Sequence, residues 1–134
     1  MGGSYSAVTR GITVRVQPVF LADQSEPARG RYMWAYRVQI ENGGRETVQL
    51  LRRTWRIIDA HGRMQTVQGE GVIGEQPTLE PGEAFEYTSG TPLETSSGFM
   101  EGVYHMVAPT SGEAFDIAIP AFSLDGPQAR GPVH

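Results

Sequence analysis

Apolar residues alternate with polar ones along most of this chain, and this two-residue repeat restricts the fold more than any other feature. In GITVRVQPVF, residues 11–20, the alternate positions Ile12, Val14 and Val16 are apolar and the residues between them are polar. A β-strand turns successive side chains to opposite faces, so the repeat predicts a strand with one buried face. The predicted strands cover residues 12–20, 31–42, 47–60, 63–68, 84–88, 98–107 and 114–119.

Turn-forming residues separate these strands. Asp59–Gly62 predicts a tight hairpin, because the Asp side chain can start the turn and Gly accepts a positive φ. Pro81–Gly82 predicts a type II turn, and the segment TSGE, residues 110–113, joins the last two strands. No window has apolar residues at helical spacing after a cap. The chain is therefore predicted to be all-β, with a strand pattern that is typical of a sandwich or a barrel. Of the two we favour a fibronectin type III/immunoglobulin-like sandwich of two antiparallel sheets.

The third predicted strand carries large apolar and basic side chains on opposite faces. Alternation puts one group on one face, Leu51, Arg53, Trp55 and Ile57, and a second group on the other, Arg52, Thr54 and Arg56. Indoles at such positions usually fill a sandwich core, which is what we expect for Trp34 and Trp55. An indole facing outward beside Tyr36 or Tyr87 would instead mark a protein-binding surface. Our candidates for protein binding are Arg52, Arg56 and Tyr87.

Length and charge indicate one domain without nucleic acid or membrane partners. The 134 residues suit a sandwich domain over residues 8–124, preceded by a flexible N-terminus at 1–7 and followed by a flexible tail at 125–134. Cysteine is absent, and neither an apolar leader nor a membrane-spanning run is present, so we expect a cytoplasmic location. The net charge of −4 repels a phosphate backbone.

The sequence shows no set of residues suited to catalysis or metal binding. His105 and Glu101 are the best pair of metal ligands, since they share one face of a strand, but a transition metal needs three or four ligands. No G-x-S-x-G motif supplies a nucleophile. We therefore expect no catalytic residues, no metal and no cofactor, and we predict that the chain is not an enzyme.

The segment GEGVIGEQP, residues 69–77, has the spacing G-x-G-x-x-G through Gly69, Gly71 and Gly74. Such glycines can hold a pyrophosphate where they follow a strand and open a helix. Here two prolines follow instead of a helix, and Glu70 and Glu75 would lie beside the phosphate. The residues favour a structural interpretation, a bulged strand end before a loop that crosses between the sheets, over a cofactor-binding site.

Several segments together resemble the bacterial ApaG family. They are GRYMWAYRVQIEN, VQLLRRTWRIIDAHGR, GEGVIGEQPTLEPGEAFEYTSGTPL, GFMEGVYHMV and IPAF, and the likeness covers about residues 8–124. The resemblance implies a fibronectin-type sandwich and an association with cobalt and magnesium resistance and efflux, and with genes for diadenosine tetraphosphate hydrolysis. Related domains in eukaryotic F-box proteins and in a DNA-polymerase-interacting protein imply protein binding.

The family's glycine motif matches this chain without departure, whereas two other positions depart from it. Thr54 stands where many relatives have His, and Thr91 stands where many have Cys. A metal or redox role that depends on those residues is therefore not expected here. We expect an adaptor-like module that binds proteins. The alternative is a regulator that binds pyrophosphate or nucleotides, such as a small polyphosphate, through the glycine loop.

The two functions make different structural demands. An adaptor needs an exposed apolar or aromatic patch, whereas a phosphate site needs loop amides that converge on a space flanked by arginine. Unpaired strand edges invite strand addition unless charge or proline guards them. Because the opening strand carries Arg15 and Pro18 and the last one ends at Pro120, we expect recognition through a sheet face or a loop end.

Overall fold

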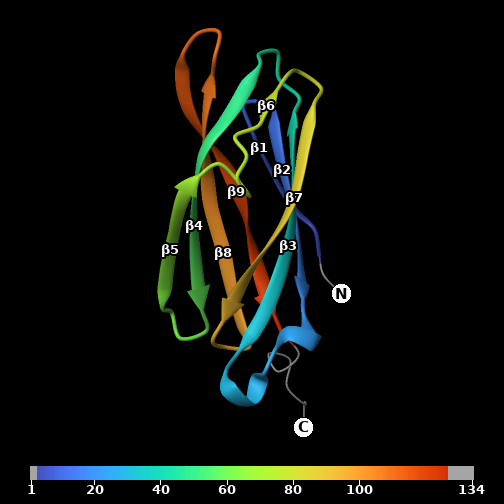
Figure 1. Cartoon of the computed structure of the whole chain (residues 1–134), viewed down its shortest axis with the longest axis vertical. Helices are drawn as coiled ribbons and strands as arrows, with labels where there is room; N and C mark the ends of the chain where they lie inside the picture. The colour runs from blue at the N-terminus through green and yellow to red at the C-terminus, as the bar shows by residue number, and fades with distance from the viewer. Residues whose placement is uncertain (1–2, 127–134) are drawn as a thin grey trace.

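Two antiparallel sheets pack face to face in the computed structural model, which describes residues 3–126 (Figure 1). The first sheet has the order β1-β2-β3-β7, formed by β1 (Tyr5–Thr9), β2 (Ile12–Phe20), β3 (Tyr32–Asn42) and β7 (Ala84–Leu93). The second has the order β5-β4-β8-β9, formed by β4 (Val48–Asp59), β5 (Met64–Glu70), β8 (Ser97–Ala108) and β9 (Glu113–Asp125). This architecture confirms the predicted fibronectin type III/immunoglobulin-like sandwich.

Three short elements complete the description. Strand β6 (Thr78–Leu79) pairs with the first residues of β4, on the edge that β5 covers further along. The 3-10 turns η1 (Ala22–Gln24) and η2 (Pro27–Arg29) connect β2 to β3 at one end of the sandwich. No helix within residues 3–126 is long and apolar enough to cross a membrane.

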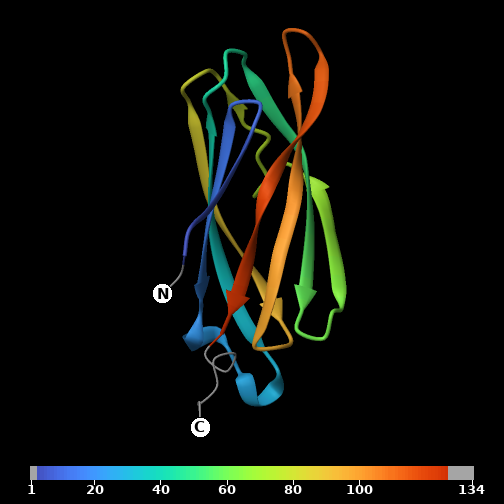
Figure 2. The same ribbon diagram turned by 180° about the vertical axis from the view of Figure 1, so that it is seen from behind.

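The sheets approach each other along the side where β1 and β2 lie against β9 (Figure 2). There the Ala118 amide donates to the Thr9 hydroxyl at 3.1 Å. On the other side of the sandwich, β5 and β7 are the outer strands of their sheets. The sandwich is therefore linked along one side and has two separate strand edges along the other.

The core lies between the sheets and contains the residues that the alternation predicted. Ile12, Val14 and Val16 are buried from β2. Trp55 is 2% exposed, and its ring lies 5.1 Å from that of Tyr36 and 6.0 Å from that of Phe122. Trp34 is buried as well, so the prediction that both indoles are core residues is confirmed.

A bulge changes the predicted phase at the start of β4. The pairing of β4 with β8 shifts register between Leu50 and Arg52, so Leu50 is fully buried and Leu51 only partly. A bulge adds one residue to a strand and reverses the alternation on either side of it. Trp55 and Ile57 lie beyond the bulge and face the core as predicted.

The structure has two strands that the sequence analysis did not predict, the two-residue β6 and the longer β1. β1 pairs with β2 through a turn in which Arg10 and Gly11 both have positive φ, 53° and 80°. That is a type I′ turn. Its first central residue is arginine instead of the usual asparagine, so the Asn-Gly pair that predicts such a turn is absent. Strand pairing thus begins at Tyr5, within the segment assigned to a flexible N-terminus. The outer strand of this sheet is β1. The expectation that Arg15 and Pro18 prevent strand addition was made for β2, which lies inside the sheet.

Two strands continue past residues that looked like strand ends. β7 runs through Ser89 and Gly90 because its ladder with β3 continues as far as Leu93. β9 runs through Pro120, where the register against β8 shifts between Met100 and Gly102. Proline is tolerated at a bulge because no ladder hydrogen bond is needed from its nitrogen. β9 ends at Asp125, and most of the predicted tail lies outside the described residues.

The predicted turns form where the sequence placed them. β4 and β5 form a hairpin closed by Asp59–Gly62, and β8 and β9 form the last hairpin. Gly82 has φ 91°, and the Glu83 amide donates to the Glu80 carbonyl, as in a type II turn. The chain crosses from the second sheet to the first at this turn, after β6, and not directly after the glycine motif.

Candidate functional site

The glycine motif forms a compact turn at the end of β5. The amides of Val72 and Glu75 each donate to the other residue's carbonyl at 2.8 Å. The two residues between them, Ile73 and Gly74, have positive φ, 44° and 79°. This is a second type I′ turn, and it anchors the buried Val72 side chain in the core.

Each glycine of the motif has its own structural cause. Gly69 lies beneath the Arg53 guanidinium, since a Cβ there would be 2.8 Å from Nη1. Gly71 has φ 61°, and a Cβ there would be 2.1 Å from the Glu75 carbonyl oxygen. Gly74 needs positive φ but has open space around it. The three predicted cofactor-binding residues therefore come together in one loop for reasons of backbone geometry.

The amides of this loop donate to the chain itself instead of converging on a common point. The Gly71 amide donates to the Leu51 carbonyl at 2.8 Å, and the Val72 and Glu75 amides donate to each other's residues. Arg53 donates to the carbonyls of Gly71 at 2.7 Å and Glu70 at 3.2 Å. The Arg53 guanidinium therefore binds backbone oxygens of the loop. This arrangement suits a side chain that stabilises the loop better than one that binds a phosphate.

Tyr87 is wrong as a candidate for surface binding, because its side chain lies in the core. It is 6% exposed, and its hydroxyl lies 2.5 Å from that of Tyr104. Burial raises the pKa of Tyr87 and of Tyr104 well above the ordinary tyrosine value. Alternation in β7 turns Tyr87 inward, toward β4 and β8, where its hydroxyl finds a buried partner.

Arg52 and Arg56 lie on the outer face of the second sheet, as predicted. Arg52 is exposed, whereas Arg56 forms a bidentate ion pair with Glu101 on β8. The hydrogen bond from Arg56 lowers the pKa of Glu101. Glu101 and His105 do share this face, but each binds a different neighbour. No group of three or more His, Asp or Glu within residues 3–126 is placed to hold a metal ion.

A chain of three polar side chains crosses the same face, which the sequence analysis did not foresee. The Thr54 hydroxyl lies 2.8 Å from Nε2 of His105, and Nδ1 of His105 lies 2.9 Å from Asp116. This is the order of nucleophile, base and acid in hydrolytic triads. The register that places Arg52 beside His105 and His105 beside Asp116 could have shown the proximity.

The surroundings of Thr54 do not suit acyl transfer. Thr54 is 7% exposed and lies in the middle of β4, which pairs with β5 on one side and β8 on the other. The backbone amides around it are thus engaged in ladders and cannot form an oxyanion hole, which contributes a large part of hydrolase catalysis. The three side chains form a hydrogen-bonded brace across β4, β8 and β9.

A groove of about 570 Å³ lies at the end of the sandwich, where the β4–β5 hairpin meets the end of β7 and the loop around η2. Its apolar lining comes from Ile57, Met64, Pro92 and Leu93. Met64 is 60% exposed. Charged side chains surround this lining, namely Arg29, Arg31, Arg63, Glu26 and Glu94.

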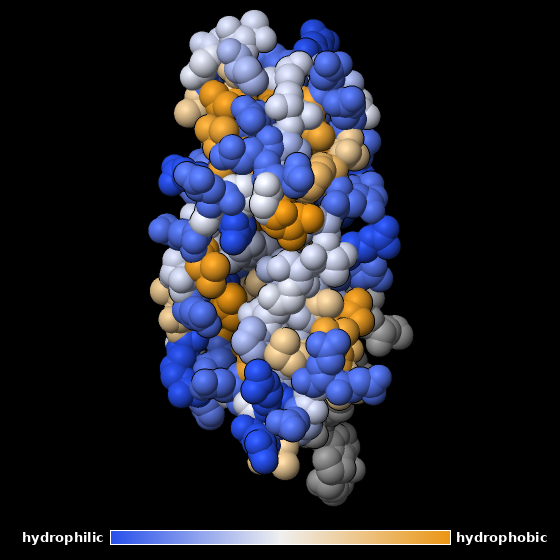
Figure 3. Space-filling view, in the orientation of Figure 1, coloured by the Kyte–Doolittle hydropathy of each residue, from blue (hydrophilic) through white to orange (hydrophobic). Residues whose placement is uncertain are grey.

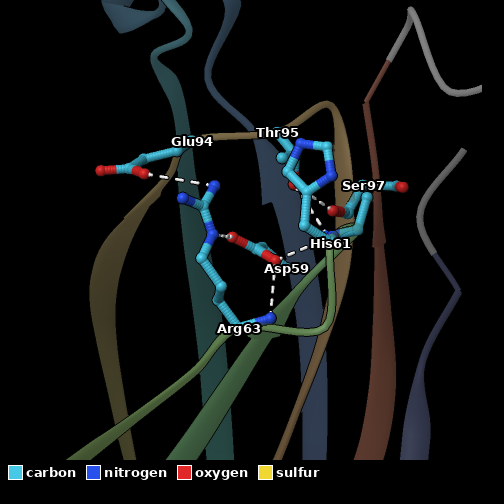
Figure 4. Close-up of polar contacts among 7 residues, drawn as sticks. Asp59, His61, Arg63, Glu94, Thr95 and Ser97 are labelled. Carbon is cyan, nitrogen blue, oxygen red and sulfur yellow. Dashed lines mark hydrogen bonds and ion pairs between the residues drawn. The ribbon is translucent and has the colours of Figure 1, made fainter.

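Hydrogen bonds hold the hairpin side of this groove in place (Figure 4). Oδ1 of Asp59 accepts from the amides of His61 and Arg63, and Oδ2 accepts from Nε of Arg63 at 2.9 Å. Arg63 also lies 3.6 Å from Glu94 in the β7–β8 connection, and the Ala60 amide donates to the Thr95 hydroxyl. The hairpin and the connection therefore form one rigid wall.

Desolvation alone would raise the pKa of Asp59. The hydrogen bonds from the two amides and from the Arg63 guanidinium outweigh it and lower that pKa below the ordinary value. Asp59 is therefore ionised at neutral pH and already has its partners, so Arg63 has little capacity left for a ligand. The remaining basic side chains at the groove are those of Arg29 and Arg31.

Exposed apolar side chains are scattered over the described surface. They are Val8, Val19, Met64, Ile73 and Phe99. Figure 3 shows the same for one face, where small apolar groups are separated by polar residues. The broad apolar patch that an adaptor was expected to show is therefore not present on this face.

Comparison with known proteins identifies the class to which this fold and loop belong. The family model described as DUF525, ApaG domain, matches residues 22–108. The matched segment runs from η1 to the end of β8 and includes the glycine motif, the hairpin wall and the groove.

Curated relatives and a solved structure agree with that assignment. Protein ApaG of Rhodospirillum centenum is 64% identical over 126 residues, covering 94% of this chain and 96% of that protein. Protein ApaG of Paramagnetospirillum magneticum is 60% identical with the same coverage. A crystal structure from Bordetella pertussis, described as ApaA, is 45% identical with a TM-score of 0.84, covering 87% of this chain and 94% of that one. This chain belongs to the ApaG family.

Proposed function

We propose that this chain is a non-enzymatic, adaptor-like module that binds another protein through the groove beside the β4–β5 hairpin. The groove carries the proposal because it combines an apolar lining with arginines, which are enriched in protein interfaces. Its hairpin wall is held by the Asp59 hydrogen bonds, so a partner would meet a preformed surface.

The family's association with cobalt and magnesium resistance would then act through the partner. A cation effect exerted by protein contact needs no metal ligands on this chain. This fits a surface where several acidic side chains pair with arginines, among them Glu41, Glu86 and Glu101. The proposal includes a cytoplasmic location and no binding to nucleic acid, in keeping with the negative net charge.

The alternative, a regulator that binds pyrophosphate or nucleotides at the glycine loop, has less support. Gly71, Val72 and Glu75 use their amides within the chain, and Glu70 and Glu75 place negative charge beside the loop. A phosphate would have to displace these hydrogen bonds and overcome that charge. The geometry of the loop supports a structural role instead.

The test is capture of a partner by the immobilised chain from bacterial lysate, compared across charge-reversal variants. Arg31→Glu changes the groove, and Arg52→Glu changes the outer sheet face. Arg15→Glu is the matched control on the other sheet, where Arg15 pairs with Glu41. We expect a partner that binds the wild type and the control but not Arg31→Glu. Loss with Arg52→Glu alone would move the site to the sheet face, and equal capture by all variants would contradict the proposal.

A further inference from the structure

Strand β5 presents a free edge next to the groove. In the second sheet it is the outermost strand, paired with β4 from Met64 to Glu70, and within residues 3–126 no strand covers its other side. Figures 1 and 2 both show it at the outer margin of the molecule. All its residues except Val67 and Gly69 are exposed.

The hydrogen-bonding phase of β5 shows which backbone groups point away from β4. The Asp59 amide donates to the Arg63 carbonyl, and the Gly71 amide donates to the Leu51 carbonyl. In an antiparallel ladder, residues alternate between pairs that exchange hydrogen bonds and pairs that do not. Odd-numbered residues of β5 therefore bond to β4, while the N–H and C=O groups of Met64, Thr66 and Gln68 point outward.

The other outer strands are guarded and β5 is not. β1 and β9 lie against each other, linked by the bond from Ala118 to Thr9. β7 carries Glu86 and Pro92, which discourage pairing with another chain. β5 has no proline, and its one charged residue is Glu70 at the far end, so the stretch from Met64 to Gly69 next to the groove carries neither guard. The edge most open to an added strand is thus the one that ends at the groove.

We infer that β5 accepts an extended segment of the partner protein as an additional strand, with apolar side chains entering the groove and a carboxylate contacting Arg29 or Arg31. Strand addition is a common mode of peptide recognition, in which main-chain bonds give affinity and pockets for alternate side chains give specificity. This inference rests on the proposed function and specifies how the partner binds.

The charges around the groove determine the expected chemistry of the segment. Arg63 is already engaged by Asp59 and Glu94. Within residues 3–126, neither Arg29 nor Arg31 forms an ion pair, although both line the groove. Two guanidinium groups beside an apolar lining suit a segment that carries Asp or Glu next to an apolar residue.

A second copy of this chain fits the edge less well. Two β5 strands would pair along seven residues, about 24 Å. Contact limited to that ladder falls short of the roughly 1,200 Å² that stable interfaces bury. An extended segment of another protein gains the ladder and the groove together, because its side chains can follow the surface.

The experiment uses a displayed library of random dodecapeptides, selected on the immobilised full chain, with the enriched peptides then synthesised for titration. Thr66→Pro removes one outward N–H and leaves the ladder with β4, whereas Thr66→Ala keeps that N–H and is the matched control. We expect peptides with alternating apolar residues and a carboxylate. Their affinity should decrease about tenfold for Thr66→Pro and stay nearly unchanged for Thr66→Ala.

Amide hydrogen exchange is measured on the wild type, so its result does not depend on whether a variant folds. Binding should protect the amides of Met64, Thr66 and Gln68, which face solvent in the free chain. Peptides that bind without protecting these amides, but lose affinity when Arg29 and Arg31 are both changed to Gln, would leave the proposed groove function standing and refute strand addition.

Failure to select any peptide would refute both the strand addition and the groove function. Peptides that bind every variant equally would also refute both. A dimer of the wild type in light scattering that becomes monomeric with Thr66→Pro would show that the edge is occupied by a second copy, and would overturn the inference about another protein.

Discussion

Replacing the three motif glycines by alanine, one at a time, should cost very different amounts of stability. If the motif held a ligand, the substitutions would act mainly on binding. The structure instead gives each position a different local geometry. Gly71 combines a positive φ with a close backbone contact, Gly74 has positive φ in open space, and Gly69 lies under a flexible arginine.

The magnitudes follow from these geometries. A left-handed conformation costs alanine about 1–2 kcal/mol, and the less flexible unfolded chain returns about 0.4–1 kcal/mol, so Gly74→Ala should cost about 1 kcal/mol. At Gly71 the Cβ would lie 2.1 Å from the Glu75 carbonyl oxygen, and such overpacking adds about 1–3 kcal/mol. Gly71→Ala should therefore cost about 2–4 kcal/mol.

Gly69→Ala tests the hydrogen bonds from Arg53 to the glycine loop. The new methyl group would displace the guanidinium from the carbonyls of Glu70 and Gly71. Hydrogen bonds from a charged donor are worth about 1.5–3 kcal/mol, but the flexible Arg53 side chain can shift and form them again, and the stiffer unfolded chain returns part of the remaining cost. The net change in stability at Gly69 should be the smallest of the three.

Urea unfolding at neutral pH, followed by tryptophan fluorescence, measures the series with both buried indoles as probes. The slope of unfolding free energy against urea should stay constant, because the folded surface does not change. An equal cost at Gly71 and Gly74 would refute the argument from close contact. A negligible cost at both, together with loss of a bound nucleotide, would favour the phosphate interpretation.

Three further outcomes are expected. Trp55→Ala should cost about 3–5 kcal/mol in urea unfolding, and a cost below about 1 kcal/mol would contradict its place in the core. Because unfolded tyrosine loses its proton near pH 10.0 while burial keeps Tyr87 and Tyr104 protonated, the folded state holds more protons above that pH. The melting temperature should therefore decrease as pH rises above 10, less steeply for Tyr87→Phe, and a decrease unchanged by that substitution would contradict this cause. Titration calorimetry with ATP, GTP or diadenosine polyphosphates at submillimolar concentration, with or without magnesium, should show no binding, and saturable heat that Gly71→Ala abolishes would contradict the adaptor proposal.

Most of the fold could be predicted because its determinants are local in sequence. Alternation in β2 and β3 fixes which side chains are buried, and Asp59 closes the β4–β5 hairpin with its own carboxylate. The elements that escaped prediction depend on distant pairing. β1 is a short strand stabilised by β2 and β9, and β7 passes through Gly90 because β3 holds it.

The same distinction applies to the candidate site. Alternation placed Arg52 and Arg56 on the outer face correctly, but Tyr87 could be assigned only once β7 was known to face β4 and β8. Its hydroxyl is satisfied by Tyr104, which lies 17 positions further along the chain. The brace from Thr54 to Asp116 likewise requires the register of β4, β8 and β9.

The edge of β5 is a case where a local signal was present but its meaning depended on topology. The predicted strand 63–68 has its only charge at Arg63 and contains no proline, and such a strand is harmless in the centre of a sheet. Only the sheet order shows that β5 is outermost, and only the tertiary structure puts Met64 at the groove. Natural proteins usually guard such edges. An unguarded edge beside Arg29 and Arg31, which form no ion pair within residues 3–126, therefore supports the proposed partner strand. Substituting a lysine at Gln68 should therefore weaken partner binding more than it changes stability, and a variant that binds as well as the wild type would contradict this explanation.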